Sequence, residues 1–404
     1  MALVAALAAW ATPSPAPAAP PDQNPGHHTG QTVGVMTRNL YLGADLSPAI
    51  GAPNLPAFVA ANGAILRQVS RTDFPTRAKG LADEILSKKP DLVGLQEVAL
   101  WRTGPPSLAP VLGGPKTATT VRYDFLQLLL DQLNKDRQLY RAAVVEPEFD
   151  FEAPADENGV SGDGPAPISN AELNARLTMR DVILVRRQGG VKVSNEQGGH
   201  FNHLLVLSIV GQSVTVTRGW TRVDAQVRGS PPFRFVNTHL EAFDNGTIRA
   251  QQAEELVASG GPADSKQPVV LLGDLNSDDG TVNGNDRLAY LKLLDAGFVE
   301  RSTDNPLSCC IHDPNLQSGT AAEFDHQVDH VLTDSPDDVK LADSSVTGRE
   351  KHNGLWDSDH AGVFSLLRIP AGLGPKPEAP PDNAASESPA GSEPNSNTGT
   401  SNSP

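Results

Sequence analysis

Residues 268–280 constrain the fold of this chain more than any other stretch. The five residues from Pro268 to Leu272 form an apolar run of the length expected for a strand buried on both faces. The run stops at Gly273, and Asp274 and Asn276 follow at once. Side chains two residues apart on an extended backbone point the same way, so we expect this carboxylate and this carboxamide to face one spot. A buried strand is therefore predicted to carry polar groups to its own end.

Two interpretations of this stretch stay open on the residues alone. A carboxylate and a carboxamide aimed at one spot suit a phosphate, its attacking water or a hard metal ion. Asp, Asn and Gly are also the usual residues of turns, so a turn without chemistry is the simpler alternative. An EF-hand calcium loop is excluded, because that motif requires glycine where Asp279 stands and glutamate where Asn285 stands.

Further clusters of polar residues at the ends of apolar strand patterns decide between these interpretations. Together with the first, they resemble the deoxyribonuclease I-like endonuclease/exonuclease/phosphatase superfamily. In chain order the matching segments are Thr37–Leu40, Asp91–Val98, Phe235–Leu240, Gly273–Asn276, Val328–Val331 and Ser358–His360. Each segment is weak alone, but six of them in the order of the family form a specific pattern.

The resemblance implies one catalytic domain over residues 31–369, of the α/β (α+β) class. Its architecture would be a four-layer sandwich, in which two mixed β-sheets pack face to face and helices cover the outer sides. The 404 residues, 38% of them hydrophobic, are enough for one such domain. Sequence periodicity predicts helices at Phe74–Lys88, Tyr123–Tyr140, Asn245–Val257 and Leu288–Ala296, and a hairpin of strands Leu204–Ile209 and Ser213–Val216.

Three segments are predicted to lie outside the packed fold. Residues 1–30 include a leader rich in Pro and Ala, and residues 370–404 are rich in Pro, Ser, Asn and Gly, so both are expected to be disordered. Glu146–Glu172 holds eight acidic residues and no lysine or arginine. Because these acidic residues lack the spacing of calcium ligands, we interpret the segment as a solvated loop inserted in the domain.

The apolar run at residues 3–11 is typical of a secretory signal. Small-residue cleavage sites follow it at Ala9–Ala11 and Ala16–Ala18. The positive charges that usually precede such a run are missing, so either the true start lies upstream or the run is not a signal. We favour export, since the run is too short to cross a membrane and no later segment is long enough. The predicted location is therefore secreted or extracytoplasmic.

The two cysteines of the chain, Cys309 and Cys310, are adjacent. Neighbouring α-carbons of a trans peptide are about 3.8 Å apart, which is below the usual range for a disulfide, so a bridge here would be a strained vicinal ring. A vicinal disulfide that clips a loop of an exported protein and a pair of packed thiols stay open as alternatives.

The resemblance implies that a divalent metal takes part. Its ligands would be Glu97 and Asn39, with Asp359 as a further ligand, and the ion would be Mg²⁺, with Mn²⁺ or Ca²⁺ as alternatives. Glu97 is also notable without the resemblance, because a carboxylate at the end of a buried strand is costly to leave unpaired. Family members differ in whether one or two metals act, and that point stays open here.

The resemblance also implies a set of catalytic residues. They are His360 as the base that activates water, Asp329 as its orienting acid, Asp274 and Asn276 as groups that position the water, and His239 and Arg180 as stabilisers of the developing negative charge. Arg176 is a rival to Arg180, and an ion pair with Asp181 is the structural alternative for Arg180. Which group is the formal base differs within the family and stays open.

Charge restricts the partners of this chain. The formal net charge is −16, and no extended basic stripe is present, so tight sequence-specific DNA binding is not expected. Outside the acidic insert and the tail, the body is only mildly acidic. No transmembrane segment and no obligate protein partner are predicted.

The superfamily includes nucleases, inositol-phosphate phosphatases and sphingomyelinase-like lipid phosphodiesterases. Export and the mildly acidic body favour an extracellular phosphodiesterase or nuclease that acts on nucleic acid without sequence specificity. The lipid alternative would need an exposed aromatic hairpin, and with 5% aromatic residues none is evident. A binding module that kept the fold and lost its chemistry is disfavoured, because the full set of polar positions is present.

Overall fold

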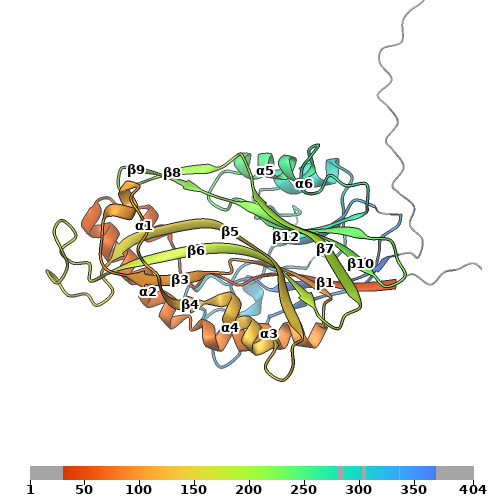
Figure 1. Ribbon diagram of the computed structural model, residues 1–404, viewed down its shortest axis with the longest axis horizontal. Coiled ribbons are helices and arrows are strands. Elements are labelled where there is room, and N and C mark those ends of the chain that lie inside the picture. Colours follow the sequence, from red (N-terminus) through yellow and green to blue (C-terminus); the bar gives the residue numbers. More distant parts are fainter. Residues whose placement is uncertain (1–30, 281–285, 303–305, 336, 370–404) are drawn as a thin grey trace, which may run out of the picture.

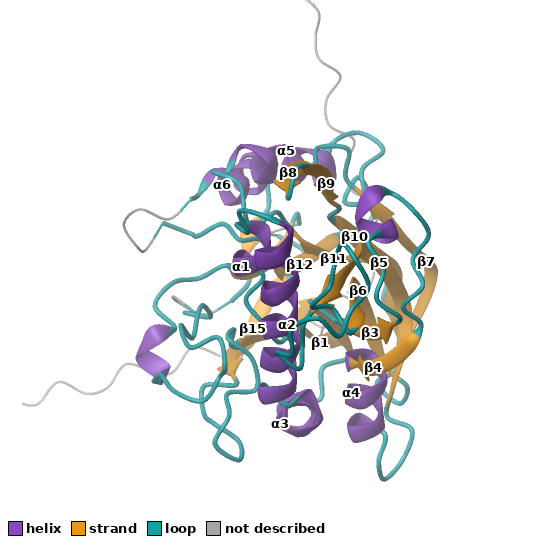
Figure 2. Ribbon diagram, turned by 90° about the vertical axis from the view of Figure 1, so that its left-hand side faces the viewer, coloured by secondary structure: helices purple, strands orange, loops and turns teal. Residues whose placement is uncertain are grey.

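The computed structural model describes residues 31–280, 286–302, 306–335 and 337–369. Two large β-sheets pack face to face, and helices lie on the outer side of each (Figure 1, Figure 2). The predicted four-layer α/β (α+β) sandwich is therefore confirmed. The predicted leader at residues 1–30 and the predicted tail at residues 370–404 lie outside the described residues. Within the described ranges, no helix has the length and apolar character needed to span a membrane.

The larger sheet contains eight strands. They are β1 (Gln31–Asn39), β2 (Leu92–Gln96), β3 (Leu100–Gly104), β4 (Thr120–Asp124), β5 (Tyr140–Ala155), β6 (Leu173–Arg186), β15 (Lys340–Thr347) and β16 (Gly362–Ile369). Neighbouring strands follow the order β15-β16-β1-β2-β6-β3-β4, and β5 pairs with β6. Because β1 is parallel to β2, Asn39 at its end lies opposite Gln96, the residue before Glu97.

The smaller sheet contains six strands. They are β7 (Val191–His200), β10 (Gly219–Val227), β11 (Phe233–His239), β12 (Val269–Asp274), β13 (Val299–Glu300) and β14 (Asp329–Thr333). Their order is β13-β14-β12-β11-β10-β7. The apolar run predicted as a buried strand is β12, and every one of its residues is buried. Side chains such as Val35 and Ile183 of the larger sheet and Phe235 and Val270 of the smaller sheet form the core between the sheets.

Helices cover the outer face of each sheet (Figure 1). Against the larger sheet lie α2 (Leu55–Arg71), α3 (Phe74–Lys88) and α4 (Phe125–Leu133), and against the smaller sheet lie α5 (Thr247–Val257) and α6 (Leu288–Asp295). The connections contain α1 (Ser47–Ile50), η1 (Ala109–Leu112) and η2 (Ala321–Glu323). The helix predicted at Phe74–Lys88 is confirmed with its bounds, and α5 and α6 match their predictions to within two residues.

The predicted hairpin is also confirmed. Its strands are β8 (Leu205–Ile209) and β9 (Gln212–Val216), which form a two-stranded sheet of their own. The turn residues Val210 and Gly211 both have positive φ, 43° and 79°. Positive φ at both central residues is the backbone of the tight turn that suits the twist of a hairpin.

Two predictions next to β5 are wrong. The helix predicted over Tyr123–Tyr140 is shorter, because Asp124 still belongs to β4 and Tyr140 already begins β5. The solvated-loop interpretation of Glu146–Glu172 fails as far as Ala155, since β5 continues through these residues and pairs with β6. Only residues 156–172 form a loop.

Two acidic residues of β5, Asp150 and Glu152, are compatible with a strand because their carboxylates have hydrogen-bond partners. The Asp150 carboxylate accepts hydrogen bonds from Arg176 Nε at 2.8 Å and from Thr178 Oγ1 at 2.7 Å. Glu152 is fully buried and accepts the backbone N–H groups of Thr117 and Ala118. Neighbouring segments of the same polypeptide, and not water, therefore satisfy these two carboxylates.

Candidate active site

The ends of three strands of the smaller sheet bring three predicted catalytic residues side by side. β11 ends at His239, β12 ends at Asp274 and β14 begins at Asp329. The register places His239 opposite Asp274, and Asp274 opposite Asp329. All three side chains are buried. The structure therefore gathers these residues at one place, while their chemical roles stay predictions.

His360 reaches the same place from the larger sheet, two residues before β16. Its Nδ1 lies 2.8 Å from Asp329 Oδ2, and its Nε2 lies 3.7 Å from Asp274 Oδ2. Burial lowers the pKa of the His360 imidazole, but the charges of Asp329 and Asp274 outweigh burial and hold this pKa well above its ordinary value. The Asp329 carboxylate thus orients the imidazole through Nδ1, and Nε2 faces a second carboxylate, that of Asp274.

His239 has a different environment, because its neighbour is an arginine. The Arg218 guanidinium lies 3.0 Å from His239 Nδ1. Since a guanidinium only donates, Nδ1 accepts this hydrogen bond and the ring proton sits on Nε2, which lies 3.5 Å from Asp274 Oδ2. Burial, and then the positive charge of Arg218, lower the pKa of His239 well below its ordinary value. His239 is thus a neutral hydrogen-bond donor that faces Asp274.

The Asn276 side chain does not take the predicted position. The backbone turns there, with φ of 47°, so the extended geometry assumed from the sequence does not apply. The backbone N–H of Asn276 donates to Asp274 Oδ1 at 2.9 Å, and its carboxamide nitrogen donates to the Leu240 carbonyl at 3.0 Å. Asn276 therefore fixes the Asp274 carboxylate through its backbone and ties the ends of β11 and β12 together.

Glu97 and Asp359 form an acidic pair beside these residues. Glu97 follows β2 with a positive φ of 54°, and its Oε2 accepts the Leu42 N–H at 2.6 Å. Burial, and then the negative charge of Asp359, raise the pKa of Glu97 to about 7. Burial also raises the pKa of Asp359. A hard divalent cation stabilises two carboxylates held in such a place, so Glu97 and Asp359 fit the predicted metal site.

The third predicted ligand, Asn39, is held by two hydrogen bonds. Its Nδ2 donates to Asp274 Oδ2 at 2.9 Å, and its Oδ1 accepts the Tyr41 N–H at 2.8 Å. The carbonyl oxygen keeps a second lone pair for a cation. A different group, formed by Asp274, Asp329 and His360, has its ligand atoms within 4.8 Å of one another and could also hold a metal. Both one and two metal sites are compatible with this geometry.

The role expected for Arg180 is not supported by its contacts. Its guanidinium donates to the carbonyls of Val98 and Ala99 and forms a 2.6 Å ion pair with Asp124. The alternative partner, Asp181, does not appear among these contacts. The rival residue Arg176 pairs with Asp150 at 2.7 Å. Both guanidinium groups are therefore occupied by structural partners, and neither contacts His239.

Arg218 is the arginine whose guanidinium contacts the ring of His239, and the sequence did not single it out. It is buried, it precedes β10, and besides His239 it lies 3.8 Å from Glu241. No strand-end motif surrounds it. The one usable signal was its position next to the strand at Gly219–Val227, because a charged residue that enters a buried strand needs a partner.

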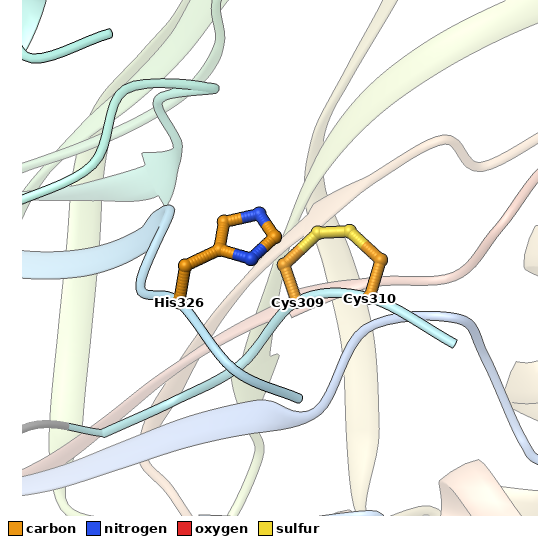
Figure 3. Close-up of side chains that lie close together, drawn as sticks. All are labelled: Cys309, Cys310 and His326. Atoms are coloured by element: carbon orange, nitrogen blue, oxygen red, sulfur yellow. A yellow bond between two sulfur atoms is a disulfide. The ribbon is translucent and has the colours of Figure 1, made fainter. Parts of the chain in front are cut away.

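Cys309 and Cys310 form a vicinal disulfide. Of the two alternatives that the sequence left open, a vicinal disulfide and a pair of packed thiols, the structure has the disulfide. Figure 3 shows the pair with the ring of His326 beside it. The two sulfur atoms lie 3.8 Å and 3.9 Å from His360 Nε2. The disulfide therefore forms part of the wall around the predicted base.

Comparison with known proteins gives one family. A family model described as "Endonuclease/Exonuclease/phosphatase family" matches residues 61–360. No curated protein matches the chain.

Similar solved structures share 15–17% sequence identity with the chain. An endonuclease/exonuclease/phosphatase family protein from Leptotrichia buccalis is 15% identical with a TM-score of 0.49, and the match covers 83% of this chain and 100% of that one. A mannosyl-6-phosphatase of Bacteroides thetaiotaomicron is 16% identical with a TM-score of 0.46 and the same two coverages. Truncated TDP2 of Caenorhabditis elegans is 17% identical with a TM-score of 0.45, over 84% of this chain and 98% of that one.

Proposed function

This chain belongs to the endonuclease/exonuclease/phosphatase family and is in general terms a hydrolase of phosphate esters, and we propose that it is a divalent-metal-dependent phosphodiesterase with water as the nucleophile. One observation carries the proposal: the His360 imidazole is held by Asp329 at 2.8 Å next to the acidic pair Glu97 and Asp359. A base, its orienting acid and a metal site thus lie around one point.

In the proposed reaction, His360 Nε2 takes a proton from water as the water oxygen bonds to phosphorus. The ester P–O bond then breaks, and the leaving oxygen takes up a proton from solvent, to which His360 returns the proton that it took from water. Asp329 keeps the His360 ring in place, and Asp274 faces the nitrogen that accepts the proton. When bound at Glu97 and Asp359, a divalent cation neutralises phosphate charge and offsets the carboxylate charge around His360.

His239 would stabilise the negative charge that develops on the phosphate. Its Nε2–H points into the site, because Arg218 occupies Nδ1. The lowered pKa of His239 keeps the ring neutral at neutral pH, so its protonation state does not change in that range. Asn39 holds Asp274 with a 2.9 Å hydrogen bond and so fixes the distance between the groups that act on the water.

The test is hydrolysis of bis(p-nitrophenyl) phosphate by the purified full-length chain in Mg²⁺, Mn²⁺ or Ca²⁺. We expect turnover with at least one of these ions, no turnover in excess EDTA, and no turnover by His360→Ala. Turnover by His360→Ala equal to that of the wild type would overturn the proposal.

Among natural substrates, nucleic acid without sequence specificity is our first candidate, and export from the cytoplasm belongs to the same proposal. The apolar run at residues 3–11 supports export. The absence of an extended basic stripe in the sequence argues only against tight, sequence-specific binding. Plasmid DNA, RNA, sphingomyelin and inositol phosphates, compared at equal phosphate concentration, would rank the candidates. N-terminal sequencing of the protein recovered outside expressing cells would test export.

A lipid phosphodiesterase is the second candidate. The observation that favours it is an apolar cavity whose lining includes Glu97 and Asp359.

A further inference from the structure

A cavity of about 420 Å³ lies between one face of β5 and β6, the helices α1 and α2, and the β8–β9 hairpin. These elements lie together at the left-hand end of the molecule in Figure 1. The volume is within the range of about 300–1,000 Å³ that is typical of small-molecule sites. Its walls are mostly apolar and include Phe58, Trp101, Phe151, Met179 and Ile209.

One end of this cavity borders the proposed active site on the side of the predicted metal ligands. Glu97, Asp359 and Arg218 all line it, and they are the two predicted metal ligands and the arginine that holds His239. A molecule in the cavity therefore has one polar end at the site of hydrolysis, and the rest of it lies against apolar walls.

The hairpin supplies one of these walls by strict alternation. Leu207, Ile209, Val214 and Val216 line the cavity, whereas Val206, Ser208, Ser213 and Thr215 between them are exposed. The hairpin pairs with neither large sheet. Since an isolated hairpin is only marginally stable, covering this apolar face is what holds it in position.

β5 and β6 present a second apolar wall. Phe149, Phe151 and Ala153 alternate along β5, and Ala175, Leu177 and Met179 alternate along β6. The intervening residue Asp150 forms its hydrogen bonds with Arg176 and Thr178. The polar residues of these strands are therefore occupied away from the cavity, and the apolar ones face it.

The walls offer few hydrogen-bond partners to a ligand. Away from Glu97, Arg218 and Asp359, the polar residues of the lining are Tyr41, Asp45, Asn62 and His312. The Tyr41 hydroxyl already donates to the Pro314 carbonyl at 2.8 Å, and the Asn62 carboxamide donates to the Pro154 carbonyl at 3.0 Å. Asp45 and His312 are exposed to solvent. The hydroxyl groups of a sugar or an inositol would lose their hydrogen bonds to water here without replacement, which is unfavourable. A hydrocarbon chain has no such cost and gains from leaving water. At 49% exposure, Phe243 also lines the cavity and offers apolar surface to a chain that enters from solvent.

We propose that this cavity binds the alkyl or acyl group of the substrate, so that the protein hydrolyses single-chain lipid phosphate esters. The inference rests on the proposed phosphodiesterase function, and the apolar cavity ranks its second candidate substrate class, lipid, before nucleic acid. The phosphate lies at His360 and Asp274, and the hydrocarbon lies along β5 and β6. Water adds to phosphorus and the ester P–O bond breaks, so no further reactant is needed.

The first test is a series of p-nitrophenyl alkyl phosphates with methyl, butyl, octyl and dodecyl groups, each below its critical micelle concentration. We expect kcat/KM to rise by up to about fourfold for each added methylene until the chain fills the cavity, and then to level off. Equal kcat/KM across the series, with bis(p-nitrophenyl) phosphate still hydrolysed, would overturn the inference and leave the proposed function intact.

A binding measurement separates the two proposals if no ester is hydrolysed. Titration calorimetry with methyl, octyl and dodecyl phosphonate and Mg²⁺ reports the cavity without any turnover. Affinity that grows with chain length supports the chain site even though the proposed function fails. Affinity that is independent of chain length overturns the chain site as well.

Two neighbouring residues of β9 give a matched pair of variants. In Val214→Trp the indole is directed into the cavity, and in Thr215→Trp it is directed into solvent. We expect Val214→Trp to lower kcat/KM for the octyl ester to the value for the methyl ester, because the indole fills the space of the alkyl chain. We expect Thr215→Trp to retain the preference.

The melting temperatures of both variants check that each is folded. An unchanged chain-length preference in a folded Val214→Trp would contradict the inference. If Val214→Trp does not fold, the chain-length series and the phosphonate titration on the wild type still decide whether the cavity binds the hydrocarbon chain.

Discussion

Two regions of the molecule meet at Glu97 and Asp359, and they are built in opposite ways. The strand-end region, formed by His239, Asp274, Asp329 and His360, consists of buried polar groups held by hydrogen bonds and strand register. The cavity region, formed by the walls around the 420 Å³ cavity, consists of apolar faces of β5, β6, α1, α2 and the β8–β9 hairpin.

This difference indicates that chemistry and substrate choice are separable. A change in the strand-end region alters the groups that we propose act on phosphorus, so it should lower turnover of every ester by a similar factor. A change in the cavity region alters only the fit of the group attached to the phosphate, so it should change the ranking of substrates. The predictions below test this separation, first at the metal site and then, in order of decreasing loss of kcat, at the residues around it.

Metal removal should have the largest effect. Excess EDTA is expected to abolish hydrolysis of all esters, because Glu97 and Asp359 offer hard oxygen ligands to a divalent cation. Activity is measured before and after chelation and again after Mg²⁺ is restored. Full turnover in excess chelator would show that the acidic pair is structural.

Glu97→Gln tests the same metal site by a smaller change. We expect the Mg²⁺ concentration for half-maximal activity to rise by about tenfold or more, with the fold intact. Glu254→Gln is the matched control, since Glu254 is exposed and pairs with Lys292. An identical metal titration for Glu97→Gln and the control would remove Glu97 from the site.

His360→Ala should lower kcat by about a hundredfold or more for short and long esters alike, because it removes the oriented base. Asp329→Asn should come close to the same loss. The double variant should be much less than additive, since the 2.8 Å hydrogen bond makes the two residues one unit. His203→Ala, an exposed histidine paired with Glu255, is the control.

If the effects of His360→Ala and Asp329→Asn simply multiply, the two residues do not act together. A loss confined to long-chain esters would break the separation between the two regions. His239→Ala is expected to lower kcat by about a hundredfold as well, with little change in melting temperature.

Arg218→Ala should lower kcat by about tenfold, because His239 loses the donor that sets its tautomer and lowers its pKa. Arg218→Lys should recover part of the loss, since an ammonium group keeps the charge but not the planar fork. Steady-state kinetics with one short and one long ester measure both variants. No recovery by lysine, together with a large fall in melting temperature, would indicate a purely structural role.

Arg180→Ala should have the smallest effect on catalysis and act on stability instead. Its guanidinium holds the carbonyls of Val98 and Ala99 and pairs with Asp124. We expect the free energy of unfolding to fall by about 1–3 kcal/mol, and kcat to fall less than in Arg218→Ala. A loss of kcat as large as that of Arg218→Ala at unchanged stability would restore to Arg180 the role predicted from the sequence.

The sequence by itself determined the strand-end region. β12 was predictable because an apolar run and the polar residues after it are adjacent in the chain. The same local signal marks His239 at the end of β11, Asp329 at the start of β14 and Glu97 after β2. A buried strand that ends in polar groups can be recognised from about ten consecutive residues. Six such segments in the order of the family were therefore enough to indicate the family, the sandwich and the gathering of these side chains.

Only the tertiary structure decided what these segments contact. Arg218 lies beside His239 because β10 and β11 pair antiparallel, which brings the residue before β10 next to the end of β11. Asn276 turns away because its backbone enters the left-handed region. Asp150 and Glu152 of β5 looked solvated, yet Arg176 of β6 and the backbone N–H groups of Thr117 and Ala118 satisfy their carboxylates. The helix α2 was not predicted at all.

The cavity is the feature that depends most on tertiary structure and least on local sequence. Its walls come from five elements whose apolar residues would fill an ordinary core equally well in sequence terms. Apolar side chains carry no direction of their own, because the hydrophobic effect depends on the area removed from water and not on which partner removes it. Whether such faces close on one another or leave a space is decided by packing across the whole fold. The sequence therefore determined where the chemistry lies, and the tertiary structure decided what can be brought to it.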